Sequence, residues 1–215
     1  MRNEARVGRV ARGSFCMAAG SAGESAYTLL ELMFAIALSA VLGAIAVPSL
    51  ASATDEVRAA GAVRYVATKL HQSRTEAISR SADVGWQFVV TGTGAYSYTP
   101  FLDGNGNGVR TRDIQQAVDL PLCPLERLAD RFDGVDFGVM PGLPAIDSGS
   151  SPPGTDPIRL GSGSILTFTP LGTATSGTLY IQGRRNAQYA IRISGETGKI
   201  RVLKFDPRSR QWKPA

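Results

Sequence analysis

A single glutamate lies inside a long apolar stretch of the chain, and its charge requires a partner. Residues 29–47 are apolar or small except for Glu31 and Ser39. A carboxylate inside a helix that spans hydrocarbon is costly unless an opposite charge offsets its lost hydration. No lysine or arginine occurs between Arg12 and Arg58. A partner for Glu31 must therefore come from a chain terminus or from another molecule.

Basic side chains gather near the C-terminus, where they could bind phosphate. Residues 184–215 hold nine lysines and arginines against two acids, a formal charge of +7, whereas residues 27–183 carry −4. This asymmetry favours an acidic partner. The candidate DNA-binding residues are Arg184, Arg185, Lys199, Arg201 and Lys204, and Trp212 could add stacking on bases. The alternative is that these charges are solvated or contact an acidic neighbouring subunit.

A short run of oxygen-bearing side chains imitates part of a calcium loop. Asp103, Asn105 and Asn107 alternate with glycines, as the first ligands of such a loop do. The glutamate expected at the twelfth position is replaced by Ile114. A weak calcium site and an Asx-rich turn both remain open, and the sequence favours the turn. No cofactor and no other metal site is expected.

The sequence lacks the motifs of common enzyme classes. It contains no Gly-x-Ser-x-Gly, no His-Glu-x-x-His and no Cys-x-x-Cys. Residues 195–199 superficially resemble a phosphate loop, but Ile200 stands where serine or threonine is required. This segment instead predicts a hairpin turn, and we expect a protein without catalytic activity.

One long helix and a set of short strands must position these residues. At about 1.5 Å per residue, a helix over the apolar run is about 28 Å long, enough to cross a bilayer core. The helix continues over residues 51–82 with one apolar face, formed by Val63, Val66, Ala67, Leu70, Ala77 and Ile78. Alternation and turn signals predict strands at 84–90, 95–101, 131–140, 164–170, 177–182, 188–194 and 199–203, and an exposed loop at 141–163.

The N-terminal residues resemble the processing motif of type IV pilins and type II secretion pseudopilins. The motif is carried by Tyr27-Thr28-Leu29-Leu30-Glu31-Leu32-Met33, after a short basic segment. The resemblance implies that a prepilin peptidase cuts between Ala26 and Tyr27 and that the new amine is N-methylated. It also implies that Glu31 pairs with this amine of a neighbouring subunit and that Pro48 kinks or loosens the helix. Ala26 stands where the family usually has glycine.

Further motifs narrow the resemblance to the GspH/FimT group of minor pilins and pseudopilins. They are Arg74-x-Glu76-Ala77, Phe168-x-Pro170-x-Gly172 and Gly177-Thr178-Leu179. Gly198-Lys199-Ile200-Arg201 is similar to the Gly-Arg-x-Arg motif with which some FimT-type minor pilins hold DNA, with lysine replacing the first arginine. The implied fold is α+β, type IV pilin-like, with a long N-terminal transmembrane helix packed on antiparallel β-sheet.

This resemblance implies a minor pilin or pseudopilin, a structural subunit of a type II secretion pseudopilus or a type IV pilus. The alternative is a DNA-binding minor pilin that takes part in DNA uptake. The expected partners are other pilin or pseudopilin subunits, the prepilin peptidase, the inner membrane and, in the alternative, DNA.

The expected domains are a leader (1–26), a transmembrane half-helix (27–50), an amphipathic half-helix (51–82) and a β-rich globular domain (83–215). Four arginines in residues 1–26 keep that end cytoplasmic, so the chain crosses the bacterial inner membrane once, with the C-terminal domain periplasmic or in an extracellular filament. An ordinary signal anchor or a cleaved signal peptide is the alternative, but the apolar region of a signal peptide would be shorter and would not contain an acid. Cys16 lies in the leader and Cys123 in the body, so no internal disulfide is expected in the processed chain.

Overall fold

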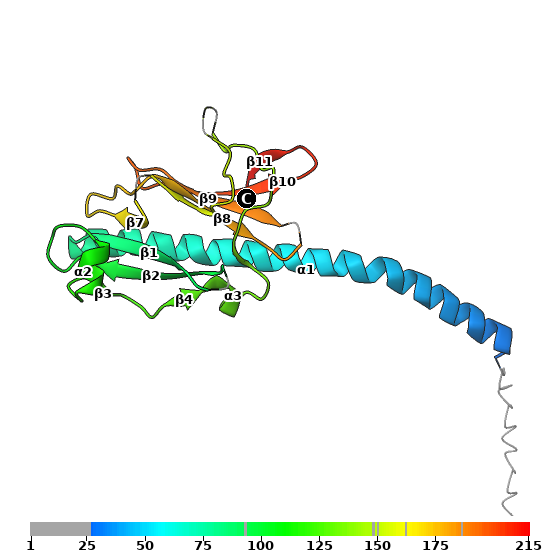
Figure 1. Cartoon of the computed structure of the whole chain (residues 1–215). Helices are drawn as coiled ribbons and strands as arrows, with labels where there is room; N and C mark the ends of the chain where they lie inside the picture. Colours follow the sequence, from blue (N-terminus) through cyan, green and yellow to red (C-terminus); the bar gives the residue numbers. More distant parts are fainter. Residues whose placement is uncertain (1–26, 93, 148, 150, 162, 186) are drawn as a thin grey trace, which may run out of the picture. The chain divides into compact units, whose positions relative to one another are not determined.

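The computed structural model describes residues 27–215 except 93, 148, 150, 162 and 186 (Figure 1). The expected leader, with Ala26, lies outside the described residues. The chain divides into two compact units, residues 1–44 and 45–215. We call the second unit the head domain. It contains all the strands and most of the one long helix.

The long helix α1 (Leu29–Arg80) begins at a threonine cap. The Thr28 Oγ1 atom accepts the backbone N–H of Glu31 at 3.2 Å, and the Thr28 carbonyl accepts that of Leu32 at 3.1 Å. The helix continues through Pro48. Its first part is long and apolar enough to cross a membrane, and its apolar side chains are exposed, as at Phe34 (67%).

The second part of α1 buries a stripe of small and aliphatic side chains. Positions 59, 62, 63, 66, 70, 73 and 77, spaced mostly by three and four, are buried. Ile78 does not share this face, contrary to the prediction, because it lies beside the stripe and is 48% exposed. The helix ends where Ser81 takes a positive φ of 52° and the N–H of Ala82 bonds to the carbonyl of Ala77.

The first antiparallel sheet has the order β3-β2-β1-β7, with β4 also paired to β2. Its strands are β1 (Val84–Val90), β2 (Tyr96–Leu102), β3 (Leu120–Pro121), β4 (Glu126–Arg127) and β7 (Ile165–Phe168). The short helix α2 (Thr111–Gln115) lies between β2 and β3, and α3 (Leu128–Arg131) follows β4 and leads to the second sheet.

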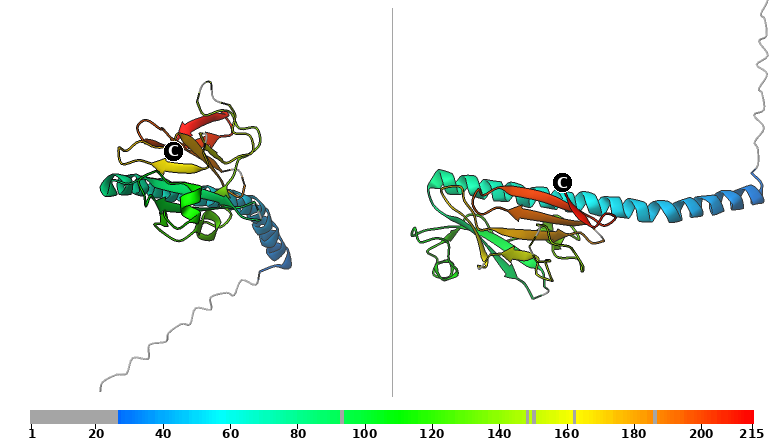
Figure 2. Two further views of the ribbon diagram at one scale, coloured as in Figure 1. Left: turned by 60° about the vertical axis from the view of Figure 1, so that its left-hand side comes forward. Right: turned by 90° about the horizontal axis from the view of Figure 1, so that it is seen from above.

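The second antiparallel sheet has the order β11-β10-β9-β8-β5, with β6 also paired to β8. Its strands are β5 (Asp136–Phe137), β6 (Ile158–Leu160), β8 (Gly177–Gln182), β9 (Gln188–Ile193), β10 (Ile200–Asp206) and β11 (Gln211–Pro214). Both sheets run beside the second part of α1 (Figure 2).

The inner faces of both sheets share one core with α1. The Trp86 ring stacks on Tyr98 at 5.0 Å, and its Nε1 donates to Ser73 Oγ of the helix at 2.8 Å. Leu179 and Ile191 of the second sheet are buried in the same core. The predicted α+β fold, with a long helix packed on antiparallel β-sheet, is therefore confirmed.

Two sequence-based element assignments were wrong. The strand predicted at 131–140 is reduced to Asp136–Phe137, because α3 occupies residues up to Arg131 and Gly134 turns the chain with a φ of 76°. The loop predicted at 141–163 contains β6 and buries Leu143 and Leu160. Residues near it complete a second small core on the outer face of the second sheet, formed by Tyr180, Ala190, Leu203, Val139, Ile146 and Trp212.

Candidate functional site

Glu31 lies in the first turn of α1, among exposed apolar side chains. The pattern Thr28-x-x-Glu31 is a helix-capping pattern, and a carboxylate in the first turn is favoured by the helix dipole. The other polar side chain of the run, Ser39, is satisfied because its Oγ donates to the Ala35 carbonyl at 2.7 Å. Across the described part of the chain, no ion pair involves Glu31. The geometry therefore leaves this carboxylate open to an external cation.

The five candidate DNA-binding residues are not brought onto one surface. Lys199 and Arg201 are exposed, and β-strand alternation places them on the outer face of the second sheet, where Arg201 lies opposite Arg192. Lys204 extends from the other face and pairs with Glu56 of α1. Trp212, proposed as a stacking platform, packs between Tyr180 and Phe205 and donates its Nε1 hydrogen to the Pro144 carbonyl at 3.0 Å, so its ring is used within the fold.

Arg184 and Arg185 are held at the start of the head domain by an aspartate that the sequence analysis did not single out. Asp55 of α1 is 7% exposed, and its two carboxylate oxygens accept the backbone N–H groups of Arg184 at 2.8 Å and Arg185 at 3.0 Å. The β8–β9 turn is thus fixed to the helix. No sequence pattern marks an acid that caps a turn 129 residues away.

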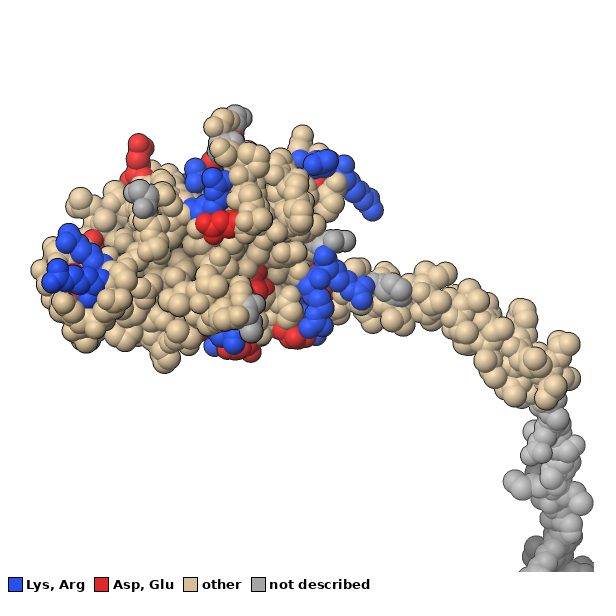
Figure 3. All heavy atoms as spheres, in the orientation of Figure 1, with Lys and Arg blue, Asp and Glu red and all other residues tan. Residues whose placement is uncertain are grey.

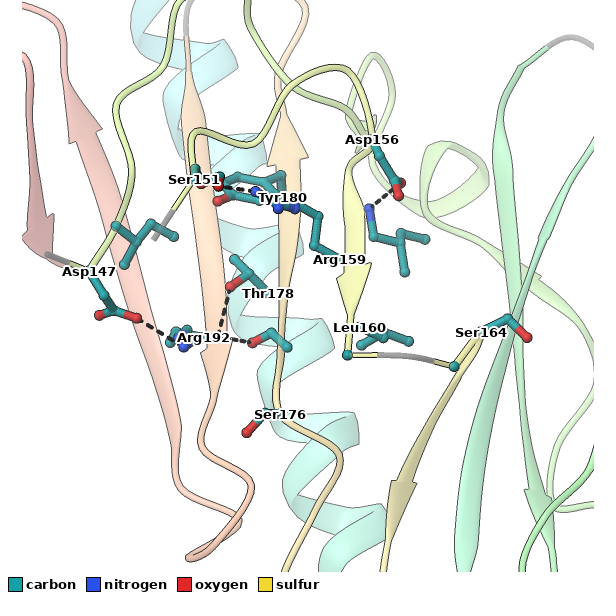
Figure 4. Close-up of a pocket in the computed structure, with 15 residues that line it drawn as sticks. Asp147, Ser151, Asp156, Arg159, Leu160, Ser164, Ser176, Thr178, Tyr180 and Arg192 are labelled. Atoms are coloured by element: carbon teal, nitrogen blue, oxygen red, sulfur yellow. Dashed lines mark hydrogen bonds and ion pairs between the residues drawn. The ribbon is translucent and has the colours of Figure 1, made fainter. Parts of the chain in front are cut away.

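A groove of about 630 Å³ lies on the outer face of the second sheet (Figure 4). It contains two arginines, but both are bound by the chain itself. Arg159 Nη1 donates to the carbonyls of Ser151 and Pro152, and Arg192 pairs with Asp147 at 2.9 Å. This groove is therefore built on structural arginines.

The segment that imitates a calcium loop forms an Asx-rich turn. Both carboxylate oxygens of Asp103 accept backbone N–H groups: Oδ1 accepts those of Asn105 and Gly106, and Oδ2 accepts that of Gly108. Asp119 likewise accepts the N–H groups of Gly104 and Arg110. Within the described residues no group of three or more His, Cys, Asp or Glu side chains is placed to hold a metal ion.

A polar network under the first sheet centres on Glu126. Its oxygens accept hydrogen bonds from Tyr65 at 2.7 Å, Lys69 at 3.1 Å and Tyr98 at 3.1 Å. Burial alone would raise the pKa of Glu126, but these bonds, those from Tyr65 and Lys69 foremost, lower it overall. Cys123 lies nearby as a free, half-buried thiol whose pKa is raised by burial.

Comparison with known proteins agrees with this architecture. The family model described as type II transport protein GspH matches residues 62–198, which cover the second part of α1 and most of both sheets. The comparisons with curated proteins and with solved structures gave no match. The matched region includes the Arg74 motif and the glycine-rich motifs of the later strands. The chain belongs to the GspH family of type II transport proteins, which are structural pseudopilins that interact with other pseudopilins.

Proposed function

We propose that the chain is a minor pseudopilin of a type II secretion system that is held in the inner membrane before it joins a pseudopilus. The family match and the long apolar helix fit a protein that crosses this membrane once. The head domain then lies on the periplasmic side, because the arginines of residues 1–26 retain that end in the cytoplasm.

Maturation removes residues 1–26 at the bond between Ala26 and Tyr27, and prepilin peptidase is the partner in this step. The cut leaves a positively charged amine on Tyr27, which stays charged after N-methylation. Glu31 is then the fifth residue of the product. An amine from a neighbouring subunit is the opposite charge that a carboxylate in an apolar environment requires.

The observation that supports this assembly role is the position of Glu31, exposed among apolar side chains and without an ion pair in the described residues. Glu31→Gln keeps the size of the side chain and removes its charge. We expect this variant to be processed normally but to be lost from sheared pseudopili when it is produced with the other pseudopilins. Glu31→Asp, which keeps the charge, should retain part of the incorporation.

A measurement of mass separates assembly from processing. The mass of the chain from membranes reports whether the leader has been removed, and Ala26→Gly serves as a matched control that restores the residue common at this site. Unchanged incorporation of Glu31→Gln into pseudopili would show that the proposed pairing does not guide assembly.

A second candidate function is DNA binding by a minor pilin of a type IV pilus. One observation favours it: Lys199, directly before β10, and Arg201 of β10 are both exposed at alternate positions of the chain. Lys199 attracts phosphate but lacks the planar fork of arginine. Arg184, Arg185 and Lys204 contribute less to such a surface, since they lie near Asp55 and Glu56 on the helix side.

A further inference from the structure

A groove with four basic side chains lies beside the part of α1 that directly follows the apolar run. Its volume is about 880 Å³. The groove is lined by the helix residues Ser52, Asp55 and Glu56, by Arg185 after β8, and by Lys204, Asp206, Arg208 and Lys213 of the last hairpin. In Figure 3, lysine and arginine side chains lie next to acids at several places on the head domain.

Two of the four basic side chains are left for an external anion. Lys204 pairs with Glu56, and Lys213 pairs with Asp206 at 2.5 Å. Asp55 is occupied by the backbone N–H groups of the β8–β9 turn. Within the part of the chain that the structure describes, the exposed side chains of Arg185 and Arg208 make no ion pair or hydrogen bond; these two residues bond through their backbone N–H groups.

The groove lies close to the end of the apolar run. At about 1.5 Å per helical residue, Ser52 lies about 8 Å beyond Val47 and Asp55 about 12 Å beyond it. The polar layer of a bilayer adds about 5–8 Å on each side of the hydrocarbon core, and charges act across a Debye length of about 8–10 Å. When residues 29–47 cross the core, Ser52 and Asp55 at the edge of the groove therefore lie within about a Debye length of the lipid phosphates.

We propose that this groove binds the phosphate of an anionic phospholipid in the membrane that holds the helix, with Arg185 and Arg208 as the contacting cations. The inference rests on the proposed insertion of the helix in the inner membrane. The contact holds the head domain against the bilayer surface before assembly and is given up when the subunit leaves the bilayer. The free energy needed to extract the subunit from the bilayer is then higher in a membrane that is richer in anionic lipid.

The test measures lipid binding to the full chain in neutral detergent, by native mass spectrometry with phosphatidylglycerol or phosphatidylcholine of identical acyl chains. Each arginine near an anionic surface contributes about fivefold in affinity, so we expect a preference of about 25-fold for phosphatidylglycerol. Arg185→Ser/Arg208→Ser should abolish this preference. Lys199→Ser/Arg201→Ser, which removes the same charge from the outer face, should retain it.

Several outcomes would overturn the proposal. The first is that the wild-type chain binds the two lipids equally. The second is that both double variants lose the preference for phosphatidylglycerol to the same extent. The third is that inorganic phosphate competes fully with the lipid, which would indicate a site for a free anion. Binding of neither lipid would also overturn the proposal, without bearing on the insertion of the helix, which the assay does not measure. Because the assay contains no other subunit, a failure of Glu31-dependent assembly leaves its result unchanged. Matching circular dichroism melts exclude unfolding of the variants.

Discussion

The Nε atom of Arg74 donates a hydrogen bond to the carbonyl oxygen of Gly172 at 3.0 Å, and Nη2 of the same side chain donates to the Thr197 carbonyl at 3.1 Å. One helix residue thus joins the turn after β7, in the first sheet, to the turn between β9 and β10, in the second sheet. Gly198 completes this junction, since a Cβ there would lie 2.2 Å from the Gly172 oxygen. Three motifs that are separate in the sequence meet at this point.

Arg74→Lys should destabilise the head domain. A lysine ammonium lacks the planar fork that reaches two carbonyls at once, so we expect a loss of about 1–3 kcal/mol in the free energy of unfolding. Urea unfolding of the full chain in neutral detergent measures it. Arg80→Lys is the matched control, because Arg80 makes an exposed pair with Glu76 and should change stability by less than about 0.5 kcal/mol. Equal midpoints for the two variants would contradict the proposed role of the junction.

Asp55→Asn should loosen the β8–β9 turn. The amide keeps one acceptor but turns an N–H group toward a backbone donor, so one of the two hydrogen bonds from Arg184 and Arg185 is lost. Leaving a buried donor unpaired costs about 1–3 kcal/mol. Hydrogen exchange of the turn should accelerate, while exchange in β1 should not change. Glu56→Gln, on the exposed neighbour, is the control, and a turn that exchanges equally in both variants would refute the anchoring role of Asp55.

The regular elements of the fold could be predicted from the sequence because their signals are local. The strands at Val84–Val90 and Gly177–Gln182 match their predicted bounds, since alternation and flanking glycines are contained within the segment itself. Strand β11 (Gln211–Pro214) was missed because it is short and lies at the edge of the sheet, where only Trp212 of its residues is partly buried and no apolar alternation marks it. Strand β6 was missed because it lies in a segment rich in proline, glycine and serine.

The candidate sites could be predicted where the residues themselves carry the signal, as at Glu31 in its apolar run. Their grouping could not, because it depends on which face of a strand each side chain takes and on pairs far apart in the chain. Lys204 and Arg201 are close in sequence but extend from opposite faces of β10. Asp55 is linked to its turn across 129 residues, and nothing local marks that contact.

Glu126 should make the stability of the head domain depend on pH in acid. Its pKa in the folded chain lies below the ordinary glutamate value of about 4.3. The stabilisation from its ionised form is therefore fully present above that value and is lost as the pH falls through the lower folded pKa. Glu126→Gln imitates the protonated form, so its melting temperature should differ most from wild type at pH 7.

This difference should shrink below about pH 4, where wild-type Glu126 also begins to take up a proton. Thermal melts of both chains between about pH 3 and 7 measure it. Glu196→Gln, on the exposed β9–β10 turn, is the control and should show a small difference at every pH. A gap between Glu126→Gln and wild type that is constant with pH would mean that the Tyr65 and Lys69 contacts do not depend on the charge of the carboxylate.

DNA binding, if it is a function of this chain, should depend on Lys199 and Arg201. The full chain in neutral detergent is titrated with duplex DNA across a salt series, and the affinity should fall as salt rises because phosphate contacts release counterions. Lys199→Ser/Arg201→Ser should weaken binding to all sequences alike and lower the salt slope by about 2, one for each lost contact. Arg184→Ser/Arg185→Ser is the control with the same charge change. Loss of DNA binding in that variant alone would show that DNA binds on the side of the head domain next to α1. No binding of DNA by the wild-type chain at low salt would leave assembly into a pseudopilus as the remaining function.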